Sequence, residues 1–308
     1  MKQTVLVTGG AGFIGSHVVD TLLEAGYQVA VVDDLSTGQV ENVPARAAFY
    51  QLDIRKQGLE EIFQAVQPDY VSHQAARANV RESLEEPVLY ADVNLVGSVN
   101  LLECCCRYEV KKVVYASTGG AVYGDPERLP VDESHPIRPL DPYGASKHHV
   151  EHHLHICRHN SCLQFTTLRY PNVYGPRQDP HGEAGVVAIF ASRMLDSQGV
   201  TINGSGEQER DFVYVGDVAR ANLLALRTGK CREYNLGTGL GTSVNQLFQA
   251  LQKLMDYPQD PQHGPPKPGE VFKTALDSKA ARRDLGWTAE VSLEEGLGRT
   301  VESFRVGR

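Results

Sequence analysis

Short apolar runs alternate with stretches of helical periodicity through the first 170 residues of the chain. Such runs are typical of strands in a parallel sheet, because these strands are buried on both faces. Residues 13–25 have helical spacing, with Ile14, Val18, Leu22 and Ala25 on one face. The expected strands are 4–9, 27–34, 47–54, 69–76, 111–118 and 163–170. The alternation predicts an α/β fold, a doubly wound parallel sheet with helices on both faces.

The pattern changes after about residue 170, where Pro and Gly become denser and the apolar segments become shorter. We interpret residues 170–308 as a smaller mixed α/β substrate-binding lobe beside a sheet domain of residues 1–169. A segment near 212–237 is expected to return to the sheet domain, so that 170–211 and 238–308 form most of the lobe. The Pro-rich residues 257–270 predict a loop within it.

Composition and charge narrow the classes of function. The chain has 308 residues, of which 41% are hydrophobic and 22% are charged, an ordinary balance for a globular protein. Its 30 Lys and Arg against 38 Asp and Glu leave a net charge of −8, and no run of Lys or Arg occurs. We therefore expect no nucleic-acid partner, because such proteins carry a basic face.

The sequence also bears on location. No stretch approaches about 18 consecutive apolar residues, so we expect no membrane span. The first residues do not have the pattern of a secretory signal, and three of the six cysteines are adjacent, at 104–106. Adjacent cysteines make a poor disulfide framework. We therefore expect a cytoplasmic protein whose cysteines are reduced helix residues.

A glycine-rich motif, TGGAGFIG at 8–15, follows the first expected strand and opens the first expected helix. The spacing of Gly9, Gly12 and Gly15 lets the backbone approach a pyrophosphate at the helix N-terminus. Asp33 ends the second expected strand, where a carboxylate binds the adenosine ribose hydroxyls and repels a 2′-phosphate. These residues predict a Rossmann-like domain that binds NAD rather than NADP.

A second motif, YGASK at 143–147, sets Tyr143 and Lys147 four residues apart, on one face of a helix. A nearby ammonium and a positive nicotinamide would lower the tyrosine pKa from its usual value of about 10. The segment YAST at 115–118 ends an expected strand with two hydroxyls. Because ligands bind beyond the carboxyl ends of parallel strands, the hydroxyls, the Tyr–Lys pair and the glycine loop should face one crevice.

Taken together, these motifs resemble those of the extended short-chain dehydrogenase/reductase family, in particular its NAD-dependent nucleotide-sugar epimerases. The segments that carry the resemblance are TGGAGFIGSH (8–17), DDLSTG (33–38), HQAA (73–76), YASTGGAVYG (115–124), YGASK (143–147), LRYPNVYGPRQDPHGEAGVVAIF (168–190), RDFVYVGDVA (210–219) and NLGTG (235–239). The resemblance extends to about residue 301. It implies reversible 4-epimerisation of a UDP-hexose through a 4-keto intermediate, with transient hydride transfer to bound NAD, in a homodimer.

The resemblance also assigns the catalytic residues. Tyr143 matches the catalytic base, and Lys147 matches the residue that holds the nicotinamide ribose. The catalytic hydroxyl ends the strand before the V-Y-G turn, which assigns it to Thr118 when the count starts from the strand. A count back from the turn gives Gly119, which has no hydroxyl, so we infer one extra residue in the turn. Ser117 is the alternative.

The remaining site residues are implied by the same motifs. The cofactor-binding residues would be Gly9, Gly12, Phe13, Ile14, Gly15, Asp33, Asp34, Ser36, Thr37, Gly38, Asp53, Ile54, Gln74, Ala75, Ala76, Asn94, Tyr143, Lys147 and Pro171. The substrate-binding residues would be Thr118, Asn172, Arg210, Lys267, Glu270 and Thr274. Arg210 would grip the diphosphate, or pair with Glu209 or Asp211 instead. Lys267 stands where an Arg is usual, which keeps the charge but loses the bidentate geometry.

One residue, Thr274, bears on which sugars are accepted, and other reactions of the same family are the alternatives. A large aromatic residue at Thr274 would block a 2-acetamido group, so the threonine predicts that UDP-hexoses with and without an N-acetyl group are accepted. An ordinary solvent-facing threonine is the alternative. Residues 119–121 are Gly, Gly and Ala, which cannot move a proton, so a dehydratase is disfavoured. A UDP-glucuronate 4-epimerase stays open, because Arg77 could favour a carboxylated sugar or merely pair with Glu82 or Glu85.

A metal site and a non-catalytic role are the alternatives outside this chemistry. The segment KHHVEHHLHICRH at 147–159 holds histidine pairs four residues apart, such as His148 and His152, a spacing that can bind metal. The proposed chemistry needs no metal, so we expect a solvated or interface helix face. An NAD-binding regulatory module is the non-enzyme alternative, but such proteins typically lose the Tyr–Lys unit that this chain retains.

Overall fold

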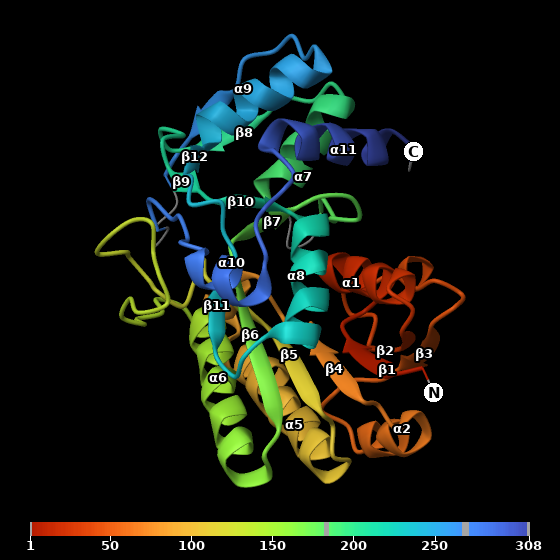
Figure 1. Cartoon of the computed structure of the whole chain (residues 1–308). Coiled ribbons are helices and arrows are strands. Elements are labelled where there is room, and N and C mark those ends of the chain that lie inside the picture. Colours follow the sequence, from red (N-terminus) through yellow and green to blue (C-terminus); the bar gives the residue numbers. More distant parts are fainter. Residues whose placement is uncertain (1, 182–184, 267–270, 307–308) are drawn as a thin grey trace.

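The computed structural model describes residues 2–181, 185–266 and 271–306 of the chain (Figure 1). Within these residues, seven parallel strands form one sheet in the order β11-β6-β5-β4-β1-β2-β3. They are β1 (Thr4–Thr8), β2 (Gln28–Asp33), β3 (Ala48–Gln51), β4 (Tyr70–His73), β5 (Lys112–Thr118), β6 (Gln164–Tyr170) and β11 (Glu233–Asn235). The order 3-2-1-4-5-6 is that of a Rossmann fold, whose ligands bind where the strand order reverses, beside β1 and β4. The predicted Rossmann-like fold is confirmed.

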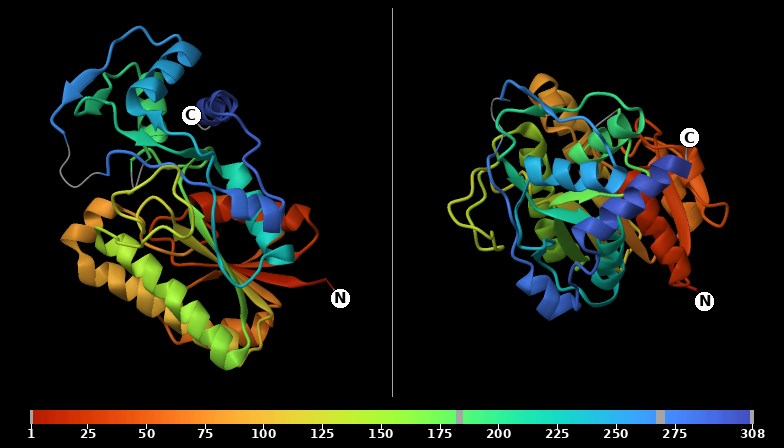
Figure 2. Two further views of the ribbon diagram at one scale, coloured as in Figure 1. Left: turned by 60° about the vertical axis from the view of Figure 1, so that its left-hand side comes forward. Right: turned by 90° about the horizontal axis from the view of Figure 1, so that it is seen from above.

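Helices cover both faces of this sheet (Figure 2). On one face lie α1 (Phe13–Glu24), α8 (Val215–Thr228) and α10 (Lys279–Leu285), and on the other α2 (Gly58–Val66), α5 (Gly97–Arg107) and α6 (Pro142–Ser161). Strand β1 shows the reason, because Val5 and Val7 pack with the first group of helices while Leu6 packs with the second. A strand that is buried on both faces has no polar side, which is why the sequence shows continuous apolar runs.

A second, smaller group of elements lies beyond the sheet, at the top of Figure 1. It contains α7 (Val186–Leu195), α9 (Val244–Met255) and α11 (Leu293–Val306), with three two-stranded pairs: β7 (Asn172–Tyr174) with β10 (Phe212–Tyr214), β8 (Thr201–Asn203) with β13 (Gln262–Gly264), and β9 (Glu209–Arg210) with β12 (Thr242–Ser243). Its apolar core includes Phe190, Leu247 and Phe248. Phe13 and Ile14 at the start of α1 pack against this core, so the glycine loop borders both groups.

The structure differs from one sequence prediction in this part of the chain. The Pro-rich segment 257–270 was expected to be a loop, but Gln262–Gly264 forms β13 and pairs in parallel with β8. In the return segment 212–237, α8 packs on one face of the large sheet, and β11 joins that sheet as its edge strand next to β6. The division of the chain at residues 169 and 170 stays a prediction.

The segment between β4 and β5 is largely helical. It contains α3 (Val80–Glu85), α4 (Pro87–Tyr90) and the π-helical turn η2 (Ala91–Val96), and a 3₁₀ turn η1 (Val40–Asn42) lies earlier in the chain. Among the described residues, one continuous helical stretch, Pro87–Arg107, has the length and apolar composition that a membrane span needs. It contacts α6 and packs against the sheet, as a core helix of this fold does.

Candidate active site

The glycine loop between β1 and α1 has the features of an anion cradle. Gly12 caps α1 without a side-chain hydrogen bond, and the first turn holds no acidic residue. A Cβ at Gly15 would lie 2.8 Å from the carbonyl carbon of Gly9, and a Cβ at Gly9 (φ 68°) would lie 2.6 Å from the backbone nitrogen of Ala75. Helix N-termini favour anions through their N–H groups and dipole. The loop therefore fits the pyrophosphate of the expected dinucleotide.

Asp33 stands at the end of β2 beside this loop. Its Oδ2 accepts a hydrogen bond from the backbone nitrogen of Ala11 at 2.9 Å, and its Oδ1 accepts one from Leu35 at 2.9 Å. Burial raises the pKa of Asp33, while these two backbone hydrogen bonds act to lower it. A Cβ at Gly38 would lie 2.9 Å from Asp33 Oδ1, so the loop closes tightly over the carboxylate. The arrangement suits ribose hydroxyls as further donors to this group.

The segment after β4 crosses the glycine loop. The backbone nitrogen of Ala75 donates to Thr8 Oγ1 at 3.3 Å, which holds residues 74–76 against the end of β1. The side chain of Gln74 points elsewhere, because its Nε2 donates to Asn222 at 3.0 Å and its Oε1 accepts from Tyr170 at 3.1 Å. The Gln74 amide is therefore engaged within the protein, and the contact of residues 74–76 with the cofactor stays a prediction.

Other expected cofactor residues are held by neighbours of their own. Asp53 accepts hydrogen bonds from Nε of Arg55 at 2.9 and 3.0 Å, and Ile54 is buried in the core. In the loop after β2, Asp34 accepts from the backbone nitrogen of Ser36 at 2.9 Å, and Thr37 and Gly38 follow. Pro171 is half-buried between β6 and β7.

Asn94 has a structural role in the π-helical turn η2. Its Nδ2 donates to the carbonyl of Arg77 at 2.9 Å and to Ser146 Oγ at 3.0 Å, and its Oδ1 accepts from the Arg77 nitrogen at 2.8 Å. Ser146 lies on α6 between the Tyr–Lys pair. Asn94 thus links the segment after β4 to α6, the helix that carries Tyr143 and Lys147. π-Helical turns such as η2 are frequent at functional sites. The side chain of Arg77 pairs with Glu82 at 3.4 Å, as one of the two readings of the sequence expected.

Local sequence fixes where α6 begins. Asp141 caps the helix through a 2.7 Å hydrogen bond from the backbone nitrogen of Gly144, and Pro142 occupies the first turn. A Cβ at Gly144 would lie 2.8 Å from the carbonyl oxygen of Ala121. This close approach sets Tyr143, in the first turn of α6, beside the turn that follows β5.

Lys147 follows one turn later and is buried at the end of β5. Its Nζ donates to the carbonyl of Ala116 at 2.7 Å and lies 5.0 Å from the centre of the Tyr115 ring. The Tyr115 hydroxyl donates to the carbonyl of Lys147 at 3.3 Å. These contacts hold the Lys147 ammonium between α6 and β5, the strand that ends in Thr118.

The structure separates the three candidates for the catalytic hydroxyl. Ser117 turns toward α6 and donates to Glu151 Oε1 at 2.7 Å. A Cβ at Gly119 would point at Leu276, 3.2 Å from its Cδ2 and closer still to its Cδ1. A Cβ at Gly120 would instead lie 3.8 Å from Thr118 Oγ1 and 4.0 Å from Asn172 Oδ1. The geometry favours Thr118, because its hydroxyl and the Asn172 amide border the same space.

The substrate-side residues come from the smaller group of elements. Arg210 in β9 donates from Nη1 to the carbonyls of Glu209 at 2.8 Å and Phe272 at 3.4 Å. The carboxylate of Glu209 pairs with Lys273 at 2.6 Å, and Asp211 accepts from Thr238 at 2.6 Å. Thr274 is buried rather than solvent-facing. Lys267 and Glu270 lie outside the described residues, so their proposed roles stay predictions.

Sequence reasoning missed the role of His73 as a buried link. Its Nδ1 lies 2.7 Å from Thr8 Oγ1 and its Nε2 lies 2.8 Å from Ser98 Oγ, while Ser98 in turn donates to the carbonyl of Asn94. Complete burial, with a smaller effect of the Lys147 charge, lowers the pKa of His73 to about 3. The imidazole is therefore neutral and connects β1 to the helix that carries Asn94. The sequence signals were its place in the apolar segment 69–76 and in the HQAA motif, and neither indicates its hydrogen-bond partners.

We expect His73 to make the folded state sensitive to acid. The unfolded chain binds a proton at His73 below a pKa of about 6.5, whereas the folded chain does not until about pH 3. Stability therefore falls as the pH falls through this window, by roughly 2 kcal/mol from His73 alone between pH 6.5 and 5. Urea unfolding at pH 7 and pH 5 measures this. His73→Asn should lose less stability between these two pH values, and the exposed control His159→Asn should behave like the parent. An equal loss in all three proteins would contradict the assignment.

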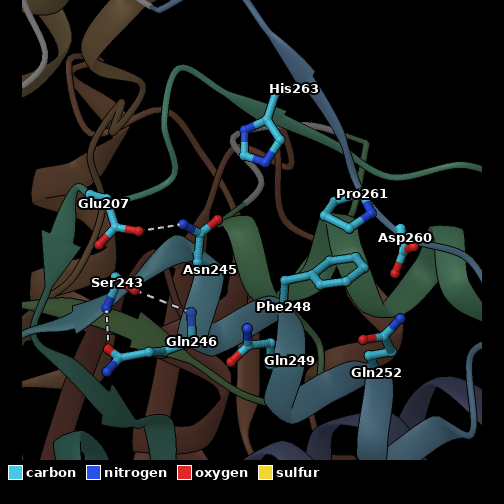
Figure 3. Close-up of a pocket in the computed structure, with 10 residues that line it drawn as sticks. All are labelled: Glu207, Ser243, Asn245, Gln246, Phe248, Gln249, Gln252, Asp260, Pro261 and His263. Atoms are coloured by element: carbon cyan, nitrogen blue, oxygen red, sulfur yellow. Dashed lines mark hydrogen bonds between the residues drawn. The ribbon is translucent and has the colours of Figure 1, made fainter.

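A cavity beside α9 is a separate feature. It has a volume of about 460 Å³ and is bordered by Glu207, Ser243, Asn245, Gln246, Phe248, Gln249, Gln252, Asp260, Pro261 and His263 (Figure 3). Its polar groups serve local structure: Asn245 donates to Glu207 at 2.6 Å, and Ser243 and Gln246 cap α9 reciprocally. None of the expected site residues lines it, so this cavity is not the predicted crevice.

The histidine-rich face of α6 was expected to bind no metal. His148 Nε2 and His152 Nε2 lie 3.1 Å apart, and the Glu151 carboxylate accepts a hydrogen bond from His148 Nδ1 at 3.0 Å. Burial, followed by the His148 charge, lowers the pKa of His152. Within residues 2–181, 185–266 and 271–306, no group of three or more His, Cys, Asp and Glu side chains is placed to hold a metal ion.

Comparisons with known proteins agree with this geometry. The chain matches the NAD dependent epimerase/dehydratase family over residues 5–237. A protein of Methanocaldococcus jannaschii named putative UDP-glucose 4-epimerase is 48% identical over 297 residues, which cover 96% of this chain and 97% of that one. The crystal structure of a UDP-glucose 4-epimerase from Thermotoga maritima with UDP-glucose is 51% identical, covers 99% of both chains and has a TM-score of 0.98. The structure of the Thermus thermophilus UDP-glucose 4-epimerase in complex with NAD is 47% identical, covers 98% of this chain and 99% of that one, and has a TM-score of 0.94.

Proposed function

The chain belongs to the NAD dependent epimerase/dehydratase family, and on that premise we propose that it interconverts UDP-glucose and UDP-galactose by inverting C4 of the hexose. It is an NAD-dependent UDP-hexose 4-epimerase. The observation that supports the proposal is the packing of the start of α6 on both sides of Thr118, where Lys147 Nζ donates to the carbonyl of Ala116 and Gly144 lies against the carbonyl of Ala121. The glycine loop and Asp33 lie at the same edge of the sheet.

In this proposal, Thr118 on β5 and Tyr143 and Lys147 on α6 carry out the chemistry at C4 of the sugar. Tyr143, as a phenolate, removes the proton from the 4-hydroxyl of the sugar and later returns it. Lys147 stabilises the phenolate and holds the nicotinamide ribose, and Thr118 hydrogen-bonds the 4-oxygen throughout. Bound NAD would supply reversible hydride chemistry at C4, so that the hexose could be oxidised to the 4-ketone and reduced again on its other face.

The rest of the site holds the two nucleotides. The glycine loop takes the cofactor pyrophosphate, and Asp33 takes the adenosine ribose. Asn172 and Arg210 hold the sugar diphosphate, a task that suits the two-pronged donor geometry of arginine. This grip lets the 4-keto sugar turn over without leaving. The residues that follow Thr118 are Gly119, Gly120 and Ala121, so no side chain in this turn is available for the proton transfers of an elimination.

The direct test uses UDP-galactose and the purified protein without added cofactor. We expect the anomeric proton signals of UDP-glucose to grow in the NMR spectrum until both sugars reach equilibrium. The same assay with UDP-N-acetylglucosamine and UDP-glucuronate ranks the substrates. Because Arg77 already pairs with Glu82, we expect the neutral sugars to be preferred over the uronate. An unchanged UDP-galactose spectrum, even after NAD is supplied, would contradict the proposal.

Thr274 supplies a prediction about substrate breadth. The side chain is buried and its backbone nitrogen donates to Glu209 at 3.2 Å, next to the Arg210 that holds the diphosphate. We expect Thr274→Tyr to fill the space for a 2-acetamido group, lowering kcat/KM for UDP-N-acetylglucosamine about 10- to 100-fold more than for UDP-galactose. Thr274→Ser is the control that keeps the space. An equal fall for both substrates would mean that Thr274 is not the gate.

We further propose that the enzyme acts in the cytoplasm as a homodimer. All six cysteines are free thiols in the described structure, as in a reducing compartment. Leu84, Val88 and Val96 on α3, α4 and η2, together with Ile156 on α6, are large exposed apolar side chains. A second copy of the chain would cover them. Sedimentation equilibrium of the protein and of a Leu84→Glu, Val88→Glu variant tests this, and a monomeric parent would contradict it.

A further inference from the structure

A buried acid on the catalytic helix is not used by the proposed chemistry. Glu151 lies four residues after Lys147 and eight after Tyr143 in α6, and its side chain is 3% exposed. Residues at this spacing share one face of a helix. Glu151 therefore faces the sheet together with the catalytic pair, one to two turns further along.

The carboxylate of Glu151 is saturated with donors. Its Oε1 accepts from Ser117 Oγ at 2.7 Å and from Arg169 Nε at 3.0 Å. Its Oε2 accepts from Arg169 Nη2 at 2.6 Å and lies 3.0 Å from His148 Nδ1. Burial alone would raise the pKa of Glu151, but the hydrogen bonds from His148 and Arg169 and the Arg169 charge lower it to about 2. The group is an ionised carboxylate at neutral pH.

This cluster, which we call the Glu151 network, ties the catalytic elements together. Ser117 lies between Ala116, whose carbonyl accepts from Lys147 Nζ, and Thr118. Two successive residues at the end of β5 are thus bound to α6 directly before the catalytic hydroxyl. A local shift of Ala116 and Ser117 would therefore be enough to displace Thr118 relative to Tyr143.

Arg169 extends the network to the turn after Thr118. It pairs in register with Ser117 across β5 and β6, and its Nη1 donates to the Tyr123 hydroxyl at 2.8 Å. Tyr123 belongs to the turn 119–124 and donates in turn to Asn235 Oδ1 of β11 at 2.7 Å. Both ends of the segment that carries Thr118 are therefore anchored to one buried ion pair.

The energetics argue that this pair is not kept for stability alone. Removing two charges from water is expensive, and apolar side chains of similar size often replace buried ion pairs without loss of stability. Hydrogen bonds between charged groups fix the geometry of their partners, because each donor must meet one lone pair at one distance. Apolar contacts do not impose this constraint. Catalytic groups need such fixed geometry, because a displacement of about 1 Å can cost about 100-fold in rate.

We propose that Glu151 is a positioning residue for the epimerisation, acting through Ser117 and Arg169 to hold Thr118 against Tyr143 and Lys147. The inference rests on the proposed function, because it assigns Thr118, Tyr143 and Lys147 their roles. It adds that the distance between the β5 hydroxyl and the α6 phenol is set by buried side chains that touch neither substrate nor cofactor.

Ser117→Ala is the sharpest test, because it removes one hydrogen bond and leaves the Glu151–Arg169 pair intact. In the holoenzyme we expect kcat to fall about 10- to 100-fold while KM and bound NAD stay within about twofold. Ser117→Thr, which restores a hydroxyl, should recover most of the rate. The matched control is Thr166→Val, which removes a buried hydroxyl that donates to Lys230 at 3.1 Å at the far end of β6. This control should lose similar stability and keep its kcat.

A second measurement does not depend on the substrate. Amide hydrogen exchange of residues 116–124 should be faster in Ser117→Ala than in the parent, and unchanged in Thr166→Val. Turnover of UDP-galactose by the parent protein tests the proposed function. The ratio of the variant kcat to the parental kcat tests the present inference, and it can be measured on whichever nucleotide sugar the parent converts. A Ser117→Ala protein with parental kcat and parental exchange would overturn the inference. An equal loss of kcat in Thr166→Val would overturn it as well, since it would show a general loss of stability.

Discussion

Tyr143→Phe should lower kcat for UDP-galactose by about 10²- to 10⁴-fold, the range that a positioned acid–base group contributes. The substitution removes one oxygen and keeps the ring, so the start of α6 should be unchanged. Asp141 still caps the helix and Gly144 still packs on Ala121. KM and bound NAD should therefore stay near the parental values, because the substitution leaves Lys147, the glycine loop and Asp33 in place as the other proposed cofactor contacts.

A matched control exists for the loss of a tyrosine hydroxyl. Tyr257 is buried near α9 and donates to the carbonyl of Gln198 at 2.6 Å, away from Thr118 and Lys147. Tyr257→Phe should keep kcat within about twofold, since it removes a hydrogen bond of ordinary strength from the smaller group of elements. Steady-state kinetics of both variants by the NMR assay decide the matter. If Tyr143→Phe retained more than about a tenth of the parental kcat, Tyr143 would not be the base.

The fold was predictable because its signals are local. The apolar run from Thr4, the helix from Phe13 and the run ending at Asp33 are each recognisable from their own residues, and all six expected strands occur with ends shifted by up to three residues. One of the two largest shifts is in 69–76, where β4 ends at His73 and the next residues cross the glycine loop. Strand β13 was missed because Gln262–Gly264 is exposed and polar, and only pairing with β8 makes it a strand.

The site was predictable only as far as its motifs extend. The positions of the glycine loop, Asp33, Tyr143 and Lys147 follow from spacing within one segment. Counting along the strand assigned the catalytic hydroxyl to Thr118, with Ser117 as the alternative. The directions of the Ser117 side chain and of a Cβ at Gly119, which favour Thr118, depend on the geometry at the end of β5 and are not contained in the spacing.

Long-range side-chain partners were also out of reach of the sequence. The amide of Gln74, a residue of the segment expected beside the cofactor, binds Asn222, a partner 148 residues away. Arg169 and Glu151 are 18 residues apart on a strand and a helix, and nothing in their spacing marks them as an ion pair. Such contacts arise from the packing of α6 and α8 on the sheet, which a single sequence does not specify.

Gly15→Ala should abolish cofactor retention. A Cβ at this position would lie 2.8 Å from the carbonyl carbon of Gly9 and 3.0 Å from the Cα of Gly10, and these are backbone atoms that no side-chain rotation can move. Either α1 shifts away from β1 or the loop opens, and both displace the N–H groups that face the pyrophosphate. We expect the purified variant to hold less than about a tenth of the parental NAD, because a loss of about 1.4 kcal/mol in binding already means tenfold. Measuring NAD released by acid from a known amount of protein tests this.

Gly298 provides the control for adding the same methyl group. It lies inside α11, where an added Cβ would meet no atom within 4 Å. Gly298→Ala should therefore keep its NAD and gain about 0.5–1 kcal/mol in the free energy of unfolding, because alanine is the better helix former. Gly15→Ala tests whether the backbone of this loop, rather than any side chain, is what holds the cofactor. Parental NAD content in Gly15→Ala would show that the cradle tolerates a Cβ, and the pyrophosphate would then have to bind elsewhere than on the N-terminus of α1.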